Sequence, residues 1–287
     1  MRTSTIVVAV DGTEPSRAAV RWAAREAVRD DRPLLLVHVL DWDAAANRYD
    51  FSGRRFDAAH RVADDIAARA AEEARTAAAV QVSTRVLAGD PAAQLVIASE
   101  QSGLMVLGHR GHGGFPGLGL GSVSQRVAMH AHCPVAVVRG RTDADGPVAV
   151  GADDADTADE VLETAFTAAR DLGTSLVVVR SYLPVLPTYR GGFPPAEVHT
   201  PEQDDAERAR LQEQLSPWRL KFPDVPVEVL LSHDTAAAVL NGVSHGSRLL
   251  VVGSRGHGVF TGTLLGSTGL QLLHHAGCPV LIVRPYR

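Results

Sequence analysis

The first half of the chain alternates short apolar runs with longer stretches in which charged and apolar residues are mixed. Continuous apolar runs predict strands that are buried on both faces of a sheet, and mixed stretches with helical spacing predict helices. The predicted strands cover residues 6–10, 34–40, 80–87, 104–108 and 134–139. The predicted helices cover residues 15–29, 53–79, 90–102 and 122–131. This alternation predicts a parallel sheet with helices on both faces.

The second half of the chain repeats the first. Residues 104–139 align without a gap on residues 249–284, and 19 of the 36 positions are identical. The beginnings of the two halves align as well, and this alignment pairs Asp11 with Asp153. An internal repeat of this length predicts two domains with the same fold. We expect the first domain at 1–141, a polar linker at 142–146 and the second domain at 147–287.

Composition narrows the classes of partner. The chain has 287 residues, of which 45% are hydrophobic, and this is sufficient for two cores. With 33 acidic and 28 basic side chains and a net charge of -5, nothing favours nucleic acid or an anionic membrane. No run approaches the ~18 apolar residues of a membrane span, and Asp11 ends the first run, so we expect a cytoplasmic protein. Cys133 and Cys278 occupy the same repeat position, and we expect both thiols to be buried and reduced.

Residues 108–122 contain seven glycines among fifteen residues. The glycines kept in both copies have the spacing G-x2-G-x9-G-S, which runs from Gly108 to Ser122 and from Gly253 to Ser267. Backbone N–H groups in such a loop, together with the N-terminus of the helix that follows, favour a phosphate group. A flexible surface loop and a set of tight turns are the alternatives, and the repeated spacing favours binding.

Three side chains near the glycine-rich loops each have two interpretations. Asp11 follows a predicted strand end, where ligands bind in such sheets, so its carboxylate suits a ribose hydroxyl. The alternative is an ordinary turn residue that caps the next helix. Arg110 and Arg255 suit a phosphate or remain solvated in the loop. The Walker lysine is missing from the loop, and no G-x-G-x-x-G follows the first strand, so neither of these motifs is present.

Several segments, taken in chain order, resemble the universal stress protein family. They are VAVDGT, VHV, GDPAAQLV, LGHRGHGGFPGLGLGSVS and HCPVAVVR in the first half, and VGADD, VGSRGHGVFTGTLLGST and GCPVLIVR in the second. The resemblance covers almost the whole chain and implies two tandem Rossmann-like α/β domains, each a five-stranded parallel sheet flanked by helices. It also implies that each domain binds one ATP, with or without Mg²⁺.

The same resemblance implies roles for individual residues. Asp11 is implied to contact ribose or adenine, and the backbone near Val39 and Leu40 is implied to line the adenine pocket. The residues implied to hold the phosphates are Gly108, Gly111, Gly121, Ser122 and Val123. The matching residues of the second half are Asp153, Gly253, Gly256, Gly266, Ser267 and Thr268. Arg110 and Arg255 complete the two sets as the loop cations.

One departure from the first half concerns the second domain. Gly12 follows Asp11, whereas Asp154 follows Asp153. A further carboxylate near a polyphosphate costs about 0.5 kcal/mol in water at a separation of ~8 Å. We therefore expect both domains to bind and the first to bind more tightly.

Nucleotide binding without rapid turnover is the expected activity, in a stress-response or signalling role, and no residue is assigned a catalytic function. Slow ATP hydrolysis or self-phosphorylation is the alternative. Rapid turnover is not expected, because the loop histidines His109, His112 and His257 have no recognisable partner at motif spacing. A metal site near Cys133 fails on spacing, because His132 becomes a glycine in the second copy. Dinucleotide or flavin binding is disfavoured because no G-x-G-x-x-G motif follows the first predicted strand.

The last predicted strand of each domain is apolar and lies at a sheet edge, which needs to be covered. In the universal stress protein family these strands pair across domain interfaces. The resemblance therefore implies that the two halves pack on each other as an intramolecular pseudo-dimer, and further homodimerisation is expected. Neither nucleic acid nor membrane insertion is expected.

Overall fold

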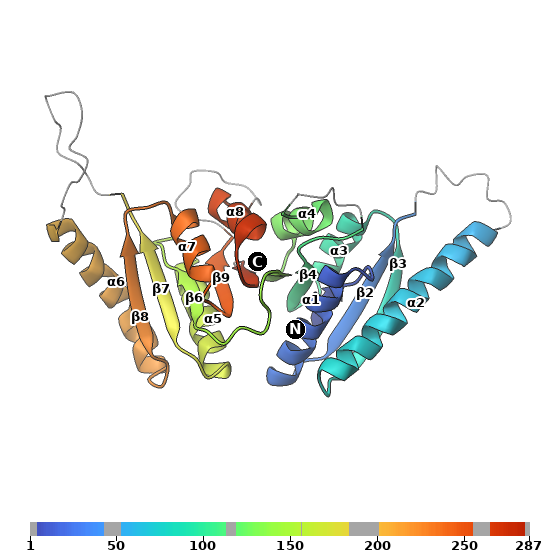
Figure 1. Ribbon diagram of the computed structural model, residues 1–287, viewed down its shortest axis with the longest axis horizontal. Helices are drawn as coiled ribbons and strands as arrows, with labels where there is room; N and C mark the ends of the chain where they lie inside the picture. The colour runs from blue at the N-terminus through green and yellow to red at the C-terminus, as the bar shows by residue number, and fades with distance from the viewer. Residues whose placement is uncertain are drawn as a thin grey trace, which may run out of the picture.

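The structure, a computed structural model, describes residues 5–42, 53–112, 119–155, 157–183, 201–254 and 265–284. It places the two domains side by side, with the long helices of each at opposite ends of the molecule (Figure 1). Two predicted site residues, Arg255 and Gly256, lie outside the described residues, as does His257.

The first domain contains the predicted strands and helices in the predicted order. Its strands are β1 (Ile6–Ala9), β2 (Leu34–Leu40), β3 (Val82–Ala88), β4 (Leu104–Gly108) and β5 (Val135–Val138). Its helices are α1 (Glu14–Arg29), α2 (Arg54–Ala77), α3 (Pro91–Ser99) and α4 (Ser122–His130).

The second domain repeats this order. Its strands are β6 (Val148–Gly151), β7 (Leu176–Ser181), β8 (Val227–Ser232), β9 (Leu249–Gly253) and β10 (Val280–Val283). Its helices are α5 (Ala158–Asp171), α6 (Pro201–Lys221), α7 (Ala236–Ser244) and α8 (Ser267–His275).

The strands form one sheet in the order β3-β2-β1-β4-β5-β10-β9-β6-β7-β8. The five strands within each domain are parallel to one another, so the predicted fold is confirmed. The domains join through β5 and β10, which pair antiparallel with Ala136 opposite Leu281. Each terminal strand therefore covers the apolar edge of the other, as expected for a pseudo-dimer.

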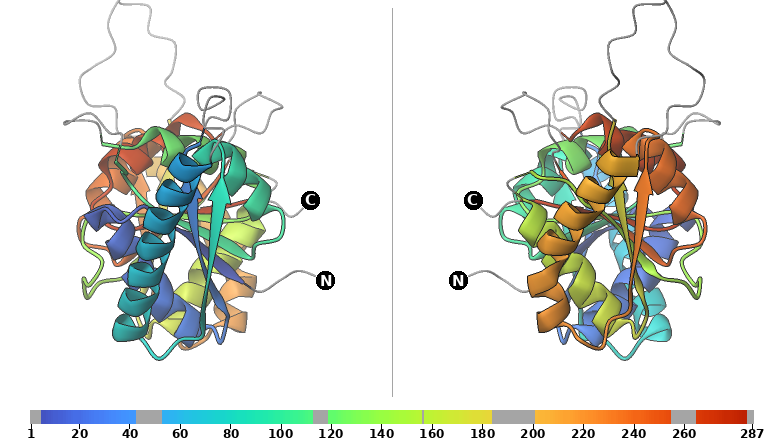
Figure 2. Two further views of the ribbon diagram at one scale, coloured as in Figure 1. Left: turned by 90° about the vertical axis from the view of Figure 1, so that its right-hand side faces the viewer. Right: turned by 90° about the vertical axis from the view of Figure 1, so that its left-hand side faces the viewer.

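Helices cover both faces of this sheet. One buried apolar layer contains residues of α1, α2, α5 and α6, and the other contains residues of α3, α4, α7 and α8. Figure 2 shows α2 and α6 at the two ends of the molecule, each beside an outer strand of the sheet. In the described part of the chain, no helix combines the length and the apolar character needed to cross a membrane.

Two arginines tie the domains together in a reciprocal way. Arg139, which follows β5, donates from Nη1 to the carbonyl oxygens of Leu272 and Leu273 near the C-terminal end of α8. Arg284, its counterpart after β10, donates from Nη2 to the Ala128 carbonyl near the C-terminal end of α4. Cations stabilise this end of a helix, where carbonyl groups lack helical partners. Each domain thus stabilises a helix of the other.

The two cysteines are buried at the starts of β5 and β10, as expected. Cys133 and Cys278 are free thiols, and burial raises the pKa of each to about 12. Because the thiolate is the reactive form, both side chains are inert core residues in the folded protein.

Candidate functional site

A cavity of about 590 Å³ opens at the carboxyl ends of β1, β2 and β4 in the first domain. This is the point at which the chain crosses from one side of β1 to the other, and open parallel sheets bind ligands there. The structure brings all nine residues predicted for the first domain to this cavity. They are Asp11, Val39, Leu40, Gly108, Arg110, Gly111, Gly121, Ser122 and Val123.

One wall of the cavity is apolar. It is formed by Val37 and Val39 of β2 and by Ala63 and Ile66 of α2. His38 also lines it, and its ring is fixed because Nδ1 donates to the Val10 carbonyl oxygen at 2.7 Å. An apolar wall of this kind suits an aromatic base, and the volume lies within the usual range for small-molecule sites.

Glycine is required on the opposite wall, because side chains there would fill the cavity. A Cβ on Gly111 would overlap Oδ2 of Asp11, and a Cβ on Gly121 would lie 3.3 Å from Cα of Arg110. Gly108 packs on the first turn of α1, where its Cβ would lie 2.6 Å from the Pro15 carbonyl oxygen. The loop therefore approaches both the carboxylate and the helix, and its backbone is left accessible.

The N-terminus of α4 faces this loop. Gly121 is the N-cap residue, and among the described residues no side chain caps the first-turn N–H groups of α4. Gly121 N donates to the His109 carbonyl oxygen at 2.8 Å, and Ser124 Oγ donates to the Gly108 carbonyl oxygen at 2.7 Å. These two bonds hold the positive end of the helix at the end of β4, which is a suitable place for an anion.

Arg110 supplies positive charge to the loop, whereas its neighbour His109 does not. Burial, and then the charge of Arg110, lower the pKa of His109 below its usual value, so the imidazole is neutral at pH 7. Arg110 lines the cavity, and this position makes its guanidinium a candidate partner for an anion.

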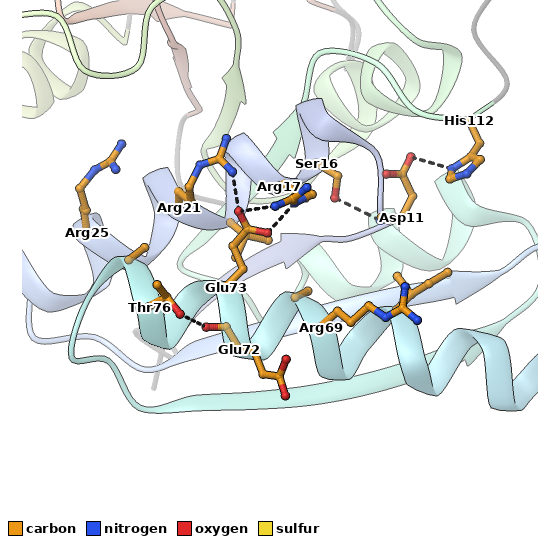
Figure 3. A pocket seen from close by; sticks show the side chains of 15 residues that line it. Asp11, Ser16, Arg17, Arg21, Arg25, Arg69, Glu72, Glu73, Thr76 and His112 are labelled. Carbon is orange, nitrogen blue, oxygen red and sulfur yellow. Dashed lines mark hydrogen bonds and ion pairs between the residues drawn. The ribbon is translucent and has the colours of Figure 1, made fainter.

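Asp11 combines both interpretations given to it. Its Oδ1 accepts from Thr13 N at 3.0 Å and from Thr13 Oγ1 at 2.6 Å, which is the turn role. Its Oδ2 points toward the loop, 4.0 Å from Nδ1 of His112, and Asp11 N donates to Ser16 Oγ at 3.1 Å (Figure 3). One carboxylate oxygen fixes the turn, and the other faces the cavity.

Asp90 and Arg126 also line the cavity but were not among the predicted site residues. Asp90 is the N-cap residue of α3, where its Oδ1 accepts from Ala93 N at 2.7 Å. Its Oδ2 accepts from Arg126 Nη1 at 3.1 Å. These two bonds, the one to Ala93 first, lower the pKa of Asp90. The second bond joins residues 36 positions apart, so local sequence gives no sign of it.

A second groove, of about 910 Å³, lies between α1 and α2 and adjoins the cavity at Asp11. Although it is larger, two of its arginines, Arg17 and Arg21, are already paired with carboxylates (Figure 3). Glu73 accepts from Arg17 Nε at 2.6 Å and also from Arg21, which in turn donates to Glu14 at 2.6 Å. These contacts join the two helices, so we assign the candidate site to the strand-end cavity.

The second domain repeats the backbone of this site. Asp153 Oδ1 accepts from Ala155 N at 3.1 Å, as Asp11 does from Thr13 N. Gly266 N donates to the Ser254 carbonyl oxygen at 3.0 Å, as Gly121 does to His109. Three further predicted residues keep their places, and Arg255 and Gly256 lie outside the described residues. Gly253 ends β9, and Ser267 and Thr268 begin α8.

The side chains of the second domain do not repeat the first. The expectation that Asp154 adds an uncompensated negative charge is wrong, because Arg180 of β7 donates to both of its carboxylate oxygens, at 3.0 and 2.6 Å. Arg180 also donates from Nε to Glu207 of α6 at 2.7 Å. The carboxylate of Asp154 is thus neutralised from within its own domain.

Comparison with known proteins gives consistent results over the whole chain. The model of the Universal stress protein family matches residues 3–139 and 146–284. A universal stress protein of Mycolicibacterium smegmatis is 33% identical over an alignment of 297 positions that covers 98% of this chain and 97% of the relative. Universal stress protein Rv1996 of Mycobacterium tuberculosis is 31% identical over 97% of this chain and 94% of its own. The crystal structure of a universal stress protein from Archaeoglobus fulgidus, 18% identical, covers 99% of both chains with a TM-score of 0.73, which shows the shared fold.

Proposed function

The chain belongs to the universal stress protein family, and from this premise and the form of the first-domain cavity we propose that it binds ATP there and acts as a nucleotide-dependent stress-response or signalling protein. The observation that carries the proposal is the meeting of an apolar wall with a glycine-rich loop and a helix N-terminus in one cavity. A nucleotide has the same division into an apolar base and an anionic phosphate chain.

Each part of the cavity has a role in this proposal. The base lies between the end of β2, at Val39 and Leu40, and the apolar face of α2. Oδ2 of Asp11, the oxygen that faces the cavity, accepts a hydrogen bond from a ribose hydroxyl. The phosphates lie against the glycine-rich loop and the first turn of α4, where Ser122 adds a hydroxyl donor and Arg110 a cation. A Mg²⁺ ion bound with ATP would share the charge of the phosphates.

We place the role of the site in binding rather than in rapid turnover. Two groups with acid–base chemistry at the cavity already have structural roles: Asp11 Oδ1 fixes a turn, and His38 Nδ1 holds the Val10 carbonyl. A cytoplasmic location fits a protein that responds to ATP. The homodimer that the family resemblance implies would form through another surface, because β5 and β10 are paired with each other.

A pair of matched variants tests the proposal by isothermal titration with ATP. In Gly121→Ala the added Cβ would lie 3.3 Å from Arg110, so the loop must shift and its N–H groups lose their alignment. We expect ATP affinity to fall at least about tenfold. In Gly266→Ala, the same position of the second domain, the nearest atom among the described residues is 3.9 Å away, and we expect no change.

Circular dichroism of both variants serves as the control for folding. Wild-type protein that fails to bind ATP would contradict the proposal, and so would a folded Gly121→Ala variant with wild-type affinity.

A further inference from the structure

We infer that the second domain holds no nucleotide, because an ion-paired cluster of Asp154, Arg180, Glu207 and Arg210 occupies the place where the first domain has the apolar wall of its cavity. The inference rests on the proposed function of the first domain and concerns how many of the two repeated sites are open. The sequence predicts two sites of unequal affinity, whereas this inference gives one open site in the first domain and one closed site in the second.

Strand register identifies the first pair of equivalent positions. β1 pairs with β2 so that Ile6 lies opposite Leu34, and β6 pairs with β7 so that Val148 lies opposite Leu176. The same offset places Arg180 of β7 at the position that His38 has in β2. The cavity of the first domain thus has an imidazole where the second domain has a guanidinium. Asp154 replaces Gly12 by the same alignment.

Helix ends identify the other two positions. Ala78 N donates to the Ala74 carbonyl oxygen at the end of α2, and Phe222 N donates to the Trp218 carbonyl oxygen at the end of α6. The two helices therefore align with a constant offset over their C-terminal turns.

With this offset, two of the four apolar α2 residues that line the cavity have charged counterparts on α6, whereas Ala59 corresponds to Gln203 and Val62 to Ala206. Ala63 corresponds to Glu207, and Ile66 corresponds to Arg210. Ala63 and Ile66 both line the first-domain cavity, and Ala63 is fully buried. The substitutions therefore fall on the wall that would contact a base.

The four charged residues bond to one another. Arg180 bonds to both oxygens of Asp154 and to Glu207, with N–O distances of 2.6 to 3.0 Å. Arg210 lies 3.8 Å from Asp154 and 3.9 Å from Glu207. Only 7% of the Arg180 side chain and 15% of the Glu207 side chain are exposed. Burial opposes the charge of Arg180, but hydrogen bonds to the two carboxylates outweigh it and raise the pKa of the guanidinium.

Further bonds hold α6 against the strand ends. Gln214 Nε2 donates to the Asp153 carbonyl oxygen at 3.0 Å. Nearer the start of the helix, Asp204 accepts from Tyr182 at the end of β7 and from His233 Nε2 at 2.7 Å. The helix is therefore bonded to the sheet on both sides of the charged cluster. These bonds hold Glu207 of α6 beside Arg180 of β7.

Inserting a base would separate Arg180 from its two carboxylates. A partly buried charge that loses its partner is strongly unfavourable, and an apolar ring offers neither carboxylate a replacement donor. We therefore expect ATP to bind the second domain at least about a hundredfold more weakly than the first. The second domain then contributes a fixed partner for α4, through Arg284, rather than a second site.

Equilibrium dialysis of the full chain against ATP tests the inference by stoichiometry. We expect about one ATP per chain, lost in Gly121→Ala and retained in Gly266→Ala. Two ATP per chain, or one ATP that is lost only in Gly266→Ala, would overturn the inference and leave ATP binding by the protein intact. No bound ATP at all would instead overturn the proposed function and this inference with it.

An exchange variant tests the cluster itself. Asp154→Gly, Arg180→His, Glu207→Ala and Arg210→Ile together give the second domain the residues of the first, and we expect a second ATP to bind. Because this variant removes four charged groups, His38→Arg with Ala63→Glu provides the reverse test, and we expect it to lower ATP binding at least about tenfold. Folded variants with unchanged stoichiometry and affinity would show that the cluster does not decide which site is open.

Discussion

Replacing Gly140 by alanine is expected to lower the free energy of unfolding by about 3 to 5 kcal/mol. Gly140 follows β5 with φ = +58°, and a Cβ there would overlap the Gly277 carbonyl group of the other domain. The carbonyl carbon and oxygen of Gly277 are both backbone atoms, so the backbone of the domain interface must move to make room for the Cβ. The substitution should therefore weaken the β5–β10 junction as well as strain one residue.

Gly173→Ala is the matched control for this prediction. Gly173 has φ = +61°, close to that of Gly140, but no atom of the described residues lies within 4 Å of the position of its Cβ. It therefore carries the backbone strain alone, and we expect a loss of about 1 to 2 kcal/mol. Urea unfolding monitored by circular dichroism measures both values. Equal losses in the two variants would mean that the contact between Gly140 and Gly277 is unimportant.

The second large effect is expected for Arg180→Ala, which should lower the free energy of unfolding by about 3 kcal/mol. The change leaves Glu207, whose side chain is mostly buried, without its closest cation, and it empties the space behind Asp154. Arg210→Ala is the control within the same cluster. Because 65% of the Arg210 side chain is exposed and its ion pairs are long, we expect a loss below about 1 kcal/mol.

Urea unfolding again gives both values, and a second measurement separates stability from binding. Since Arg180 lies in the second domain, the affinity of the first domain for ATP should not change in the Arg180→Ala variant. A stability loss no larger than that of Arg210→Ala would contradict the account of the cluster as a buried network.

Much of the fold follows from local pattern. Continuous apolar runs such as residues 104–108 could only be strands covered on both faces, and the repeat implied that each domain has the same order. The apolar terminal strands needed a partner, and their pairing through β5 and β10 provides it. Each of these predictions depends on residues that are close in sequence or on a repeat.

The first-domain site could be predicted because its residues follow strand ends, which meet at one edge of a parallel sheet. The contribution of α2 could not be read in the same way. Ala63 and Ile66 reach the cavity only because of how the helix packs, and an Ala-rich helix face looks the same whether it lines a core or a cavity.

Asp154 shows the other limit of sequence reasoning. Its carboxylate stands next to Asp153, so the sequence suggests a local excess of negative charge. Its cation, Arg180, is 26 residues away in the chain, and Glu207 lies a further 27 residues on. Whether adjacent carboxylates repel a ligand or hold an arginine depends on which strand and helix lie beside them, and tertiary structure decides this.

Photoaffinity labelling of the full chain with 2-azido-ATP, followed by mass spectrometric mapping of the labelled peptides, tests the central claim most directly. The azido group lies on the base, so it reports which residues contact the purine. We expect label in residues 37–41 of β2 and its following turn and in residues 59–66 of α2, and we expect excess ATP to prevent it. Label in β7 or α6 at comparable yield, or label that ATP does not displace, would contradict the account.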